Sequence, residues 1–377
     1  MILFNKPTLL GTEVDYINQA ITQKNHISGD GYFTKKSSKY LESYLNAPKV
    51  LLTPSCTAAL EMAALILDLK EGDEVICPSY TFATTVSSFS LRGAKPVFID
   101  IRGDTLNIDE SKIEEAINSN TKAISVVHYA GVACEMDKIL DIAKKYNLYI
   151  IEDAAQAIGS SYKGKKCGTF GDFGCFSFHE TKNIVCGEGG ALVINNEKFI
   201  DKAEIIREKG TNRSKFLRGQ VDKYTWLENG SSYLLSDINS AYLYPQVQRI
   251  GHINKVRLAL WKQYHEVFSK YEKLGRVKIP VITKSCVHNG HMYYLIFENI
   301  EERNEYINYM KSREIMVIFH YIPLHNSPAG LKYGVVSGGI DNTNKTSDCL
   351  VRLPLFYNLE QEEIVKVITE TIKFLES

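Results

Sequence analysis

The sequence lacks several features that would place it in a common class of protein. No uninterrupted apolar run reaches the ~20 residues needed to span a bilayer. Lysine plus arginine (44) equals aspartate plus glutamate (44), so no excess charge attracts nucleic acid or an anionic membrane. We therefore predict that the chain neither enters a membrane nor binds nucleic acid, and that any anion is held by a local site.

Signals for secretion and disulfide bonding are also missing. The eight cysteines are scattered through 377 residues, none forms a CxxC pair, and several lie in apolar strand-like runs. This usage is typical of buried thiols in a reducing compartment. The first residues, MILFNKPTLLGTE, lack the basic stretch and long apolar run of a secretory signal. The expected location is the cytoplasm.

Two nucleotide-binding motifs are absent as well. No GxGxxG follows a strand-like run and no GxxxxGK[ST] occurs, which disfavours a nicotinamide-dependent reductase and a P-loop enzyme. From residue 49 to about 210 the chain instead alternates short Val/Ile-rich runs with helix-length segments, which predicts βαβ units and a mostly parallel sheet covered on both faces. The expected strands are 49–55, 73–79, 95–100, 122–131 and 148–155, and the expected helices are 57–69, 83–93, 109–119 and 135–147.

The pattern changes in the rest of the chain. Further helices are expected at 197–209, at about 236–275, at 301–313 and from Gln361, and strands are expected within 291–299 and 314–325. This order is typical of a smaller α+β unit. We predict a large α/β domain at 1–240, with the first ~15 residues packing elsewhere, and a small α+β domain at 241–377.

In open α/β sheets, ligands bind at the carboxyl ends of the strands. At 53–60, TPSCTAAL, a strand runs into a helix whose free N–H groups could bind an anion, although a plain N-cap by Ser55 or Thr57 explains the same letters. Asp153 ends a wholly apolar strand, where a carboxylate needs a cationic or strongly donating partner unless it only caps the following helix.

Two further residues at strand ends attract attention. Phe82 follows the strand at 73–79, where an aromatic side chain is usually core. Lys182 lies in SFHETKN between two glycine-rich segments, and a lone loop lysine is usually solvated. Together, an anion-binding helix start, a buried aspartate, an aromatic ring and this lysine suit pyridoxal 5′-phosphate (PLP), which has a phosphate, a ring nitrogen, a planar ring and an aldehyde.

The sequence resembles the sugar aminotransferases of the DegT/DnrJ/EryC1/StrS family along almost its whole length. This resemblance implies a PLP-dependent transferase of fold type I, the aspartate-aminotransferase type. The segments that show it are TPSCTAALEMAAL, DEVICPSYTFATT, GAKPVFIDI, EDAAQAIGSSYKGKKCGTFGDFGCFSFHETKN, GEGGALVIN and FHYIPLH.

The resemblance implies roles for three residues in the chemistry. Lys182 matches the lysine that binds the cofactor covalently and then moves the proton. Asp153 matches the carboxylate facing the pyridine nitrogen, which keeps that nitrogen protonated, and Gln156 matches the residue beside the ring hydroxyl. The related 3-dehydratases have histidine in place of this lysine, so Lys182 favours amino transfer.

The resemblance also implies the remaining cofactor contacts. Phe82 matches the aromatic residue stacked on the ring, and Ser177 with the backbone of Cys56 and Thr57 matches the phosphate site. Many family members have glycine at the position of Cys56. Many also have asparagine where this chain has Ser232, in the segment that reaches the neighbouring subunit's phosphate, so we expect a homodimer in which the Ser232 hydroxyl completes the site.

The implied reaction transfers an amino group from L-glutamate to C4 of a dTDP-linked 4-keto-6-deoxyhexose. Lys223, Arg257 and His320 are candidates for binding the nucleotide-sugar, against the alternative that they are solvated or packed side chains. His179 has no assigned role. Amination at C3, the gluco stereochemistry, or a non-catalytic protein with the same fold are the alternatives, although the trio of Lys182, Asp153 and Gln156 disfavours the last.

One pattern resembles a metal site. Cys286, His288 and His291 lie within CVHNGH, but a structural zinc site would need a fourth ligand at comparable spacing, and nearby candidates are poor. We expect no metal here.

Overall fold

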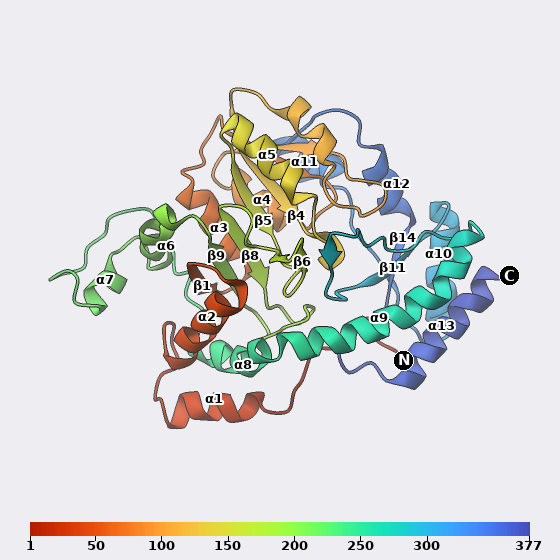
Figure 1. Ribbon diagram of the computed structural model, residues 1–377, viewed down its shortest axis with the longest axis horizontal. Coiled ribbons are helices and arrows are strands. Elements are labelled where there is room, and N and C mark those ends of the chain that lie inside the picture. Colours follow the sequence, from red (N-terminus) through yellow and green to blue (C-terminus); the bar gives the residue numbers. More distant parts are fainter.

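The computed structural model describes residues 1–377, and a central sheet with helices on both sides forms most of it (Figure 1). The strands of this sheet are β1 (Lys49–Thr53), β2 (Glu74–Pro78), β3 (Lys95–Ile99), β4 (Thr121–Val127), β5 (Tyr149–Asp153), β8 (Phe173–Ser177), β9 (Gly190–Ile194) and β13 (Val335–Val336). Their order is β1-β9-β8-β5-β4-β2-β3-β13. Only β9 runs antiparallel to its neighbours, β1 and β8, so the predicted mostly parallel α/β sheet is confirmed.

The strands are mostly apolar because both faces of the sheet are covered. Leu192 and Ile194 of β9 point to one side, and Ala191 and Val193 point to the other, since side chains alternate along a strand. The first side is covered by α3 (Cys56–Ile66) and α6 (Ile200–Arg207), and the second by α2 (Tyr32–Leu45), α5 (Met136–Tyr146) and α8 (Asp237–Gln248). This double coverage leaves the strand ends as the accessible part of the sheet.

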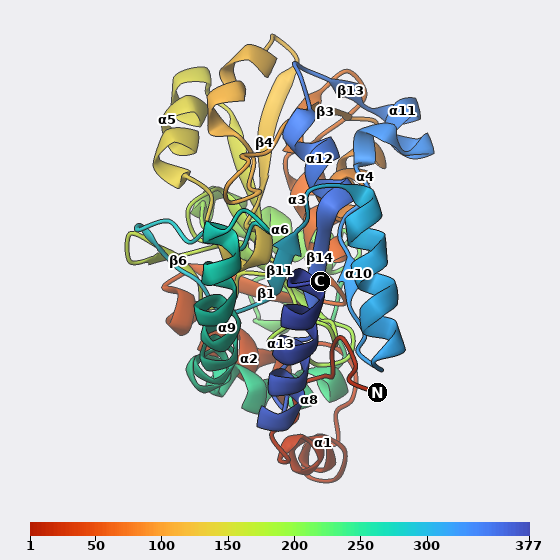
Figure 2. The ribbon, with the colours of Figure 1, turned by 90° about the vertical axis from the view of Figure 1, so that its right-hand side faces the viewer.

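A second core surrounds a small antiparallel sheet of β11 (Tyr293–Ile296), β14 (Leu350–Leu353) and β12 (Ile318–Phe319), with β14 in the centre. The helices α9 (Ile250–Lys273), α10 (Ile300–Ser312) and α13 (Gln361–Leu375) stand side by side around it (Figure 2). The smaller α+β unit predicted from the sequence has these elements.

Helix α9 belongs to both cores. Ile250 and Ile253 pack with the large sheet, whereas Leu260, Tyr264 and Phe268 pack with the small one. The boundary predicted between residues 240 and 241 falls within α8, which packs on the large sheet. We propose that the two units meet within α9 instead.

Each of the two units contains a short segment from the other end of the chain. Ile2 is buried in the small core and forms a bridge with Ile315, so the N-terminal segment packs on the C-terminal unit. In return, β13 pairs with β3 at the edge of the large sheet. No helix of the structure is both long and apolar enough to cross a lipid bilayer.

The segment 109–119 differs from its predicted helix. It forms two short 3₁₀ turns, Glu110–Lys112 and Glu114–Ala116. The Asp109 carboxylate accepts the N–H of Ser111, and the N–H of Asn118 donates to the Thr121 hydroxyl at the start of β4. These local side-chain bonds compete with helical hydrogen bonds at both ends of a short segment, which therefore does not propagate as an α-helix.

Candidate active site

A cavity of about 600 Å³ lies at the carboxyl ends of the central strands, between the large sheet and β14. Its lining residues come from the end of β5, the end of β8, the start of α3, and the 318–321 and 352–355 segments of the small unit. Eight of the residues predicted from the sequence line it: Cys56, Thr57, Phe82, Asp153, Gln156, Ser177, Lys182 and His320.

Lys182 reaches this cavity from the loop between β8 and β9. Its backbone N–H donates to the carbonyl of His179 over 2.9 Å, which fixes a tight turn. The residue as a whole is half-buried, and its amine makes no hydrogen bond or ion pair. Burial lowers the pKa of the Lys182 amine, and the negative charge of Asp153 opposes this effect only in part. A lowered pKa increases the fraction of neutral amine, which is the nucleophilic and basic form.

Asp153 ends β5 and is 6% exposed. Its carboxylate accepts a 2.6 Å hydrogen bond from the Thr85 hydroxyl and a 3.1 Å bond from the N–H of Ala155. No cationic side chain lies within ion-pair distance of this carboxylate, so its bonding partners within the chain are neutral donors. A buried carboxylate of this kind is suited to a cationic group presented from the cavity.

Gln156 is held in one orientation at the cavity wall. Its side-chain oxygen accepts the N–H of Ala130 over 2.7 Å, and its side-chain nitrogen lies 3.2 Å from the Tyr321 hydroxyl. Phe82, on the loop before α4 (Thr84–Ser90), is 56% exposed, and its ring centroid lies 6.4 Å from that of Tyr321. The cavity therefore has a fixed amide on one side and an aromatic face on another.

The start of α3 supplies an anion-binding group of backbone donors. Ser55 is the N-cap, and its hydroxyl accepts the N–H of Ala58 over 3.0 Å, while Cys56 and Thr57 hold the first helical positions, whose N–H groups have no intrahelical partner. At Gly190 of β9, a Cβ would lie 2.5 Å from the Cys56 nitrogen. Glycine there lets β9 approach the helix start, which keeps these donors beside Ser177.

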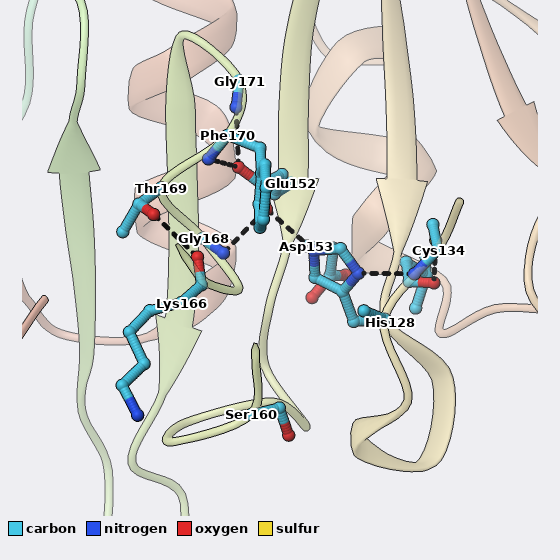
Figure 3. A network of polar contacts seen from close by, with 12 residues as sticks. His128, Cys134, Glu152, Asp153, Ser160, Lys166, Gly168, Thr169, Phe170 and Gly171 are labelled. Atoms are coloured by element: carbon cyan, nitrogen blue, oxygen red, sulfur yellow. Dashed lines mark hydrogen bonds and ion pairs between the residues drawn. The ribbon is translucent and has the colours of Figure 1, made fainter. Parts of the chain in front are cut away.

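A buried polar network holds the backbone behind Asp153 (Figure 3). Glu152, which is fully buried, accepts the N–H groups of Gly168, Phe170 and Gly171 over 2.6–2.7 Å and lies 2.8 Å from Nε2 of His128. The other ring nitrogen of His128 accepts the N–H of Cys134, so Nε2 carries the proton and donates to Glu152. This network fixes the turn that leads into β8 and thereby the strand that ends at Ser177.

Three predicted substrate or cofactor residues lie outside the cavity. Arg257 is 1% exposed and donates to the carbonyls of Gly290, His291 and Leu355, so its guanidinium joins α9 to the small unit and does not face the site. Burial lowers its pKa to about 9. Lys223 and Ser232 are exposed on the segment that follows α7 (Arg213–Leu217), which projects from the body of the molecule in Figure 1.

The three residues that resembled metal ligands have separate partners. Cys286 accepts the N–H of Ala133, and the ring of His288 packs edge-on against Trp261. Nδ1 of His291 lies 2.9 Å from the Asn183 side-chain oxygen, and burial holds the pKa of His291 well below its usual range. His291 lines the cavity as a neutral side chain, a position that the sequence analysis did not identify.

Two other lining residues were also missed. Tyr321 follows His320 in FHYIPLH, and Arg352 lies within the apolar strand LVRLPL. A signal for Arg352 was present, because an arginine inside an otherwise buried strand requires a specific reason to be there.

Comparison with known proteins shows which family the chain belongs to. The model of the DegT/DnrJ/EryC1/StrS aminotransferase family matches residues 9–372. The chain belongs to this family. It is 37% identical over 368 residues to MJ1066, an uncharacterized protein of Methanocaldococcus jannaschii, covering 95% of this chain and 94% of MJ1066. This DegT/DnrJ/EryC1/StrS protein is therefore an aminotransferase that depends on PLP, as the sequence indicated.

Solved structures of similar aminotransferases have the same fold. Spr1654 of Streptococcus pneumoniae in its PLP form is 27% identical, with a TM-score of 0.90 and coverage of 100% of this chain and 98% of Spr1654. The aminotransferase TlmJ of Streptoalloteichus hindustanus is 25% identical, with a TM-score of 0.90 and coverage of 100% and 99%. Fold type I, predicted from the resemblance, is thus confirmed.

Proposed function

We propose that this aminotransferase moves the amino group of L-glutamate to C4 of dTDP-4-keto-6-deoxyglucose and releases dTDP-4-amino-4,6-dideoxygalactose. Four segments support this substrate, because they resemble the transaminase that makes this sugar for enterobacterial common antigen: HYAGVACEMD, EIIREKGTNRS, RGQVDKYTW and GSSYLLSD. The sugar class is supported by Spr1654, which is named as a sugar aminotransferase.

The observation that carries the proposal is the desolvated, unpartnered amine of Lys182 in one cavity with the Asp153 carboxylate. Lys182 would bind PLP covalently, and Asp153 would face its ring nitrogen. The N–H groups at the start of α3, with Ser177, suit the phosphate. PLP, when bound, supplies an electron sink for the carbon that loses its proton.

The ring contacts follow from the cavity walls. The exposed ring of Phe82 offers a face on which the PLP ring would stack, and the amide of Gln156, fixed by Ala130 and Tyr321, would lie beside the ring hydroxyl of PLP. These residues would orient the cofactor but exchange no proton with the substrate.

The chain's own residues divide the proton transfers between them. The lowered pKa of Lys182 makes its Nζ a base that takes the proton from the donor's Cα and returns one to the product. The Asp153 carboxylate, oriented by the Thr85 hydroxyl, would keep a proton on the ring nitrogen of PLP. His320 stays neutral, because burial lowers its pKa well below the usual range, so it would contact the sugar as a hydrogen-bonding group.

We also propose a homodimer with shared active sites. The segment after α7 exposes Tyr224, Trp226 and Leu227, of which Trp226 is 70% exposed, and the same segment carries Lys223 and Ser232. Exposed aromatic residues are enriched at protein interfaces. In a dimer, Ser232 would reach the partner's phosphate site and Lys223 would meet the nucleotide diphosphate. A purified monomer with full activity would exclude this arrangement.

The test of the function uses the PLP-loaded protein with L-glutamate and dTDP-4-keto-6-deoxyglucose. We expect 2-oxoglutarate and a 4-amino sugar in equal amounts, with NMR couplings of the galacto configuration. A product with the gluco configuration or with nitrogen at C3 would correct the stereochemistry or position. Formation of neither product from this sugar would refute the proposed substrate.

A further inference from the structure

Arg352 is the only arginine that lines the cavity. It lies in the middle of β14, opposite Tyr294 of β11 and Ile318 of β12. Its neighbours Val351 and Leu353 are buried in the small core. Because side chains alternate along a strand, Arg352 is turned away from that core and toward the large sheet, which places its guanidinium in the cavity wall.

The guanidinium of Arg352 has no acidic partner. One terminal nitrogen donates to the carbonyl of Phe319 over 3.2 Å, Nε is buried without any partner, and the ring of Phe4 lies 4.7 Å from the central carbon. Burial lowers the pKa of Arg352, since no carboxylate offsets the lost hydration. An arginine that is desolvated and lacks a counter-charge is costly unless an anion joins it.

Neither acidic residue that lines the cavity forms an ion pair with Arg352. Asp153 accepts from Thr85 and from the N–H of Ala155, and Glu188 is exposed with its carboxylate 3.6 Å from His179. The counter-charge of Arg352 therefore has to come from a ligand.

The position of Arg352 relative to Lys182 distinguishes between two anions. The two cations line the same cavity, and the charge of Arg352 adds to the lowering of the pKa of Lys182 by burial. In an amino-acid donor, a carboxylate is attached to the same carbon as the reacting nitrogen. In the nucleotide-sugar, the diphosphate is attached at C1, across the ring from the reacting C4. A cation near the reacting amine thus suits the donor's carboxylate better than the diphosphate.

We propose that Arg352 binds the carboxylate of the amino-acid donor through its unpartnered guanidinium N–H groups. A planar guanidinium and a carboxylate match each other in a paired geometry that lysine or glutamine cannot reproduce. This inference rests on the proposed transfer from glutamate and assigns the group that recognises the donor.

The two half-reactions separate donor recognition from acceptor recognition. Holoenzyme with Arg352→Gln is mixed with L-glutamate, and the loss of cofactor absorbance is followed by stopped flow; the amino form is then mixed with the keto sugar. We expect the apparent Kd for glutamate to rise roughly 10- to 100-fold, because the variant loses a charge-assisted hydrogen-bonded pair with the carboxylate. The acceptor half-reaction should change by less than about threefold, and Arg352→Lys should recover part of the donor affinity.

Arg303 provides a matched control. Its guanidinium also lies against Phe319, at 5.7 Å from the ring, and its Nε is also buried without a partner, yet it does not line the cavity. Arg303→Gln should leave both half-reactions unchanged. If Arg303→Gln reproduced the effect, or if Arg352→Gln slowed the acceptor half-reaction as much as the donor half-reaction, the inference would be overturned.

A second measurement keeps the inference independent of the proposed function. Glutarate, an unreactive dicarboxylate, is titrated into the wild-type and Arg352→Gln holoproteins by calorimetry. Weaker binding to the variant supports carboxylate recognition even if the wild type fails to react with glutamate, a failure that would refute only the proposed donor. Equal affinity for glutarate would overturn the assignment of Arg352.

Discussion

The Thr85 hydroxyl donates a 2.6 Å hydrogen bond to the carboxylate of Asp153, and both side chains are buried. Thr85 is held in turn by the Thr81 hydroxyl at 2.9 Å. The rotamer of Asp153 is therefore fixed before any ligand arrives. A threonine on α4 thus controls how the carboxylate at the end of β5 faces the cavity.

This relationship predicts a graded pair of mutants. Asp153→Asn should lower kcat by roughly 10²- to 10³-fold, because it removes a charge that stabilises the protonated ring nitrogen. Thr85→Val, which keeps the carboxylate but not its orientation, should lower kcat by about tenfold. Steady-state kinetics of both holoproteins measures the ratio, and an equal loss in the two variants would contradict an orienting role for Thr85.

Lys182→Ala should lower kcat by at least about 10³-fold, because it removes the group that moves the proton. Borohydride treatment of wild-type holoprotein should tag the peptide that contains residue 182, as mass spectrometry would show. Lys163→Ala, which removes an exposed lysine paired with Asp137, is the control and should behave as wild type. A tag on any other lysine would refute the assignment.

The pH dependence of the same lysine has a defined direction. Burial lowers the pKa of Lys182 below 10.5, so in the cofactor-free protein its amine becomes neutral, and reactive toward an acylating reagent, at a lower pH than exposed lysines do. Peptide mapping of acylation against pH measures this midpoint. A midpoint at or above 10.5 would contradict the desolvated position of Lys182.

Asp100 predicts a pH-dependent stability. This buried carboxylate at the end of β3 accepts the N–H of Asn342 and both the N–H and the hydroxyl of Thr343 at the start of α12 (Asp341–Cys349). Burial alone would raise the pKa of Asp100, but these bonds lower it below 3.8. A depressed pKa means that the stabilisation is complete above about pH 4 and is lost as the pH falls through the folded-state value.

Asp100→Asn should therefore reduce the free energy of unfolding by about 1–3 kcal/mol at pH 7. Below pH 4 the difference from wild type should shrink, because only the wild-type carboxylate titrates. Denaturant unfolding at several pH values tests this, and a constant difference would contradict the role of the Asp100 charge.

The hydrogen bonds of Glu152 predict a large loss of stability when this side chain is replaced by one of almost the same shape. Glu152→Gln turns an acceptor of four donors into a group that also presents two N–H donors to them, which should cost about 3–5 kcal/mol. Glu114→Gln, at an exposed pair with Lys145, should leave the free energy of unfolding close to that of the wild type, because solvent screens such a pair. Chemical denaturation compares the two variants, and similar losses would show that the Figure 3 network is not the source of the stability.

Periodicity predicted the large sheet because strands such as β4 and β5 are buried on both faces and leave a continuous apolar signal. The segment 109–119 is rich in helix-forming residues, yet it folds as two 3₁₀ turns. Side-chain hydrogen bonds made by Asp109 and Thr121 decide this, and a periodic pattern does not reveal them. The short strand Ile318–Phe319 is set by its pairing with β14, a contact between distant residues.

The cavity was predictable where its residues follow strands along the chain. Asp153, Ser177 and Phe82 each stand near a strand end, and the resemblance supplied Lys182 and Gln156. The prediction failed for Arg257, since a basic residue on a helix gives no sign of whether carbonyls or a ligand will occupy it. Arg352 was missed for the converse reason: its strand gives no sign of which unit it will face until the two units are packed together.

The packing of residues 2–5 against the small unit affects the order in which parts of the cavity can fold. Phe4 and Asn5 line the cavity, and Ile2 is anchored by its bridge to Ile315. Residues 2–5 are synthesised more than 300 residues before β12 and β14, so this wall of the cavity forms only after the small unit has been made.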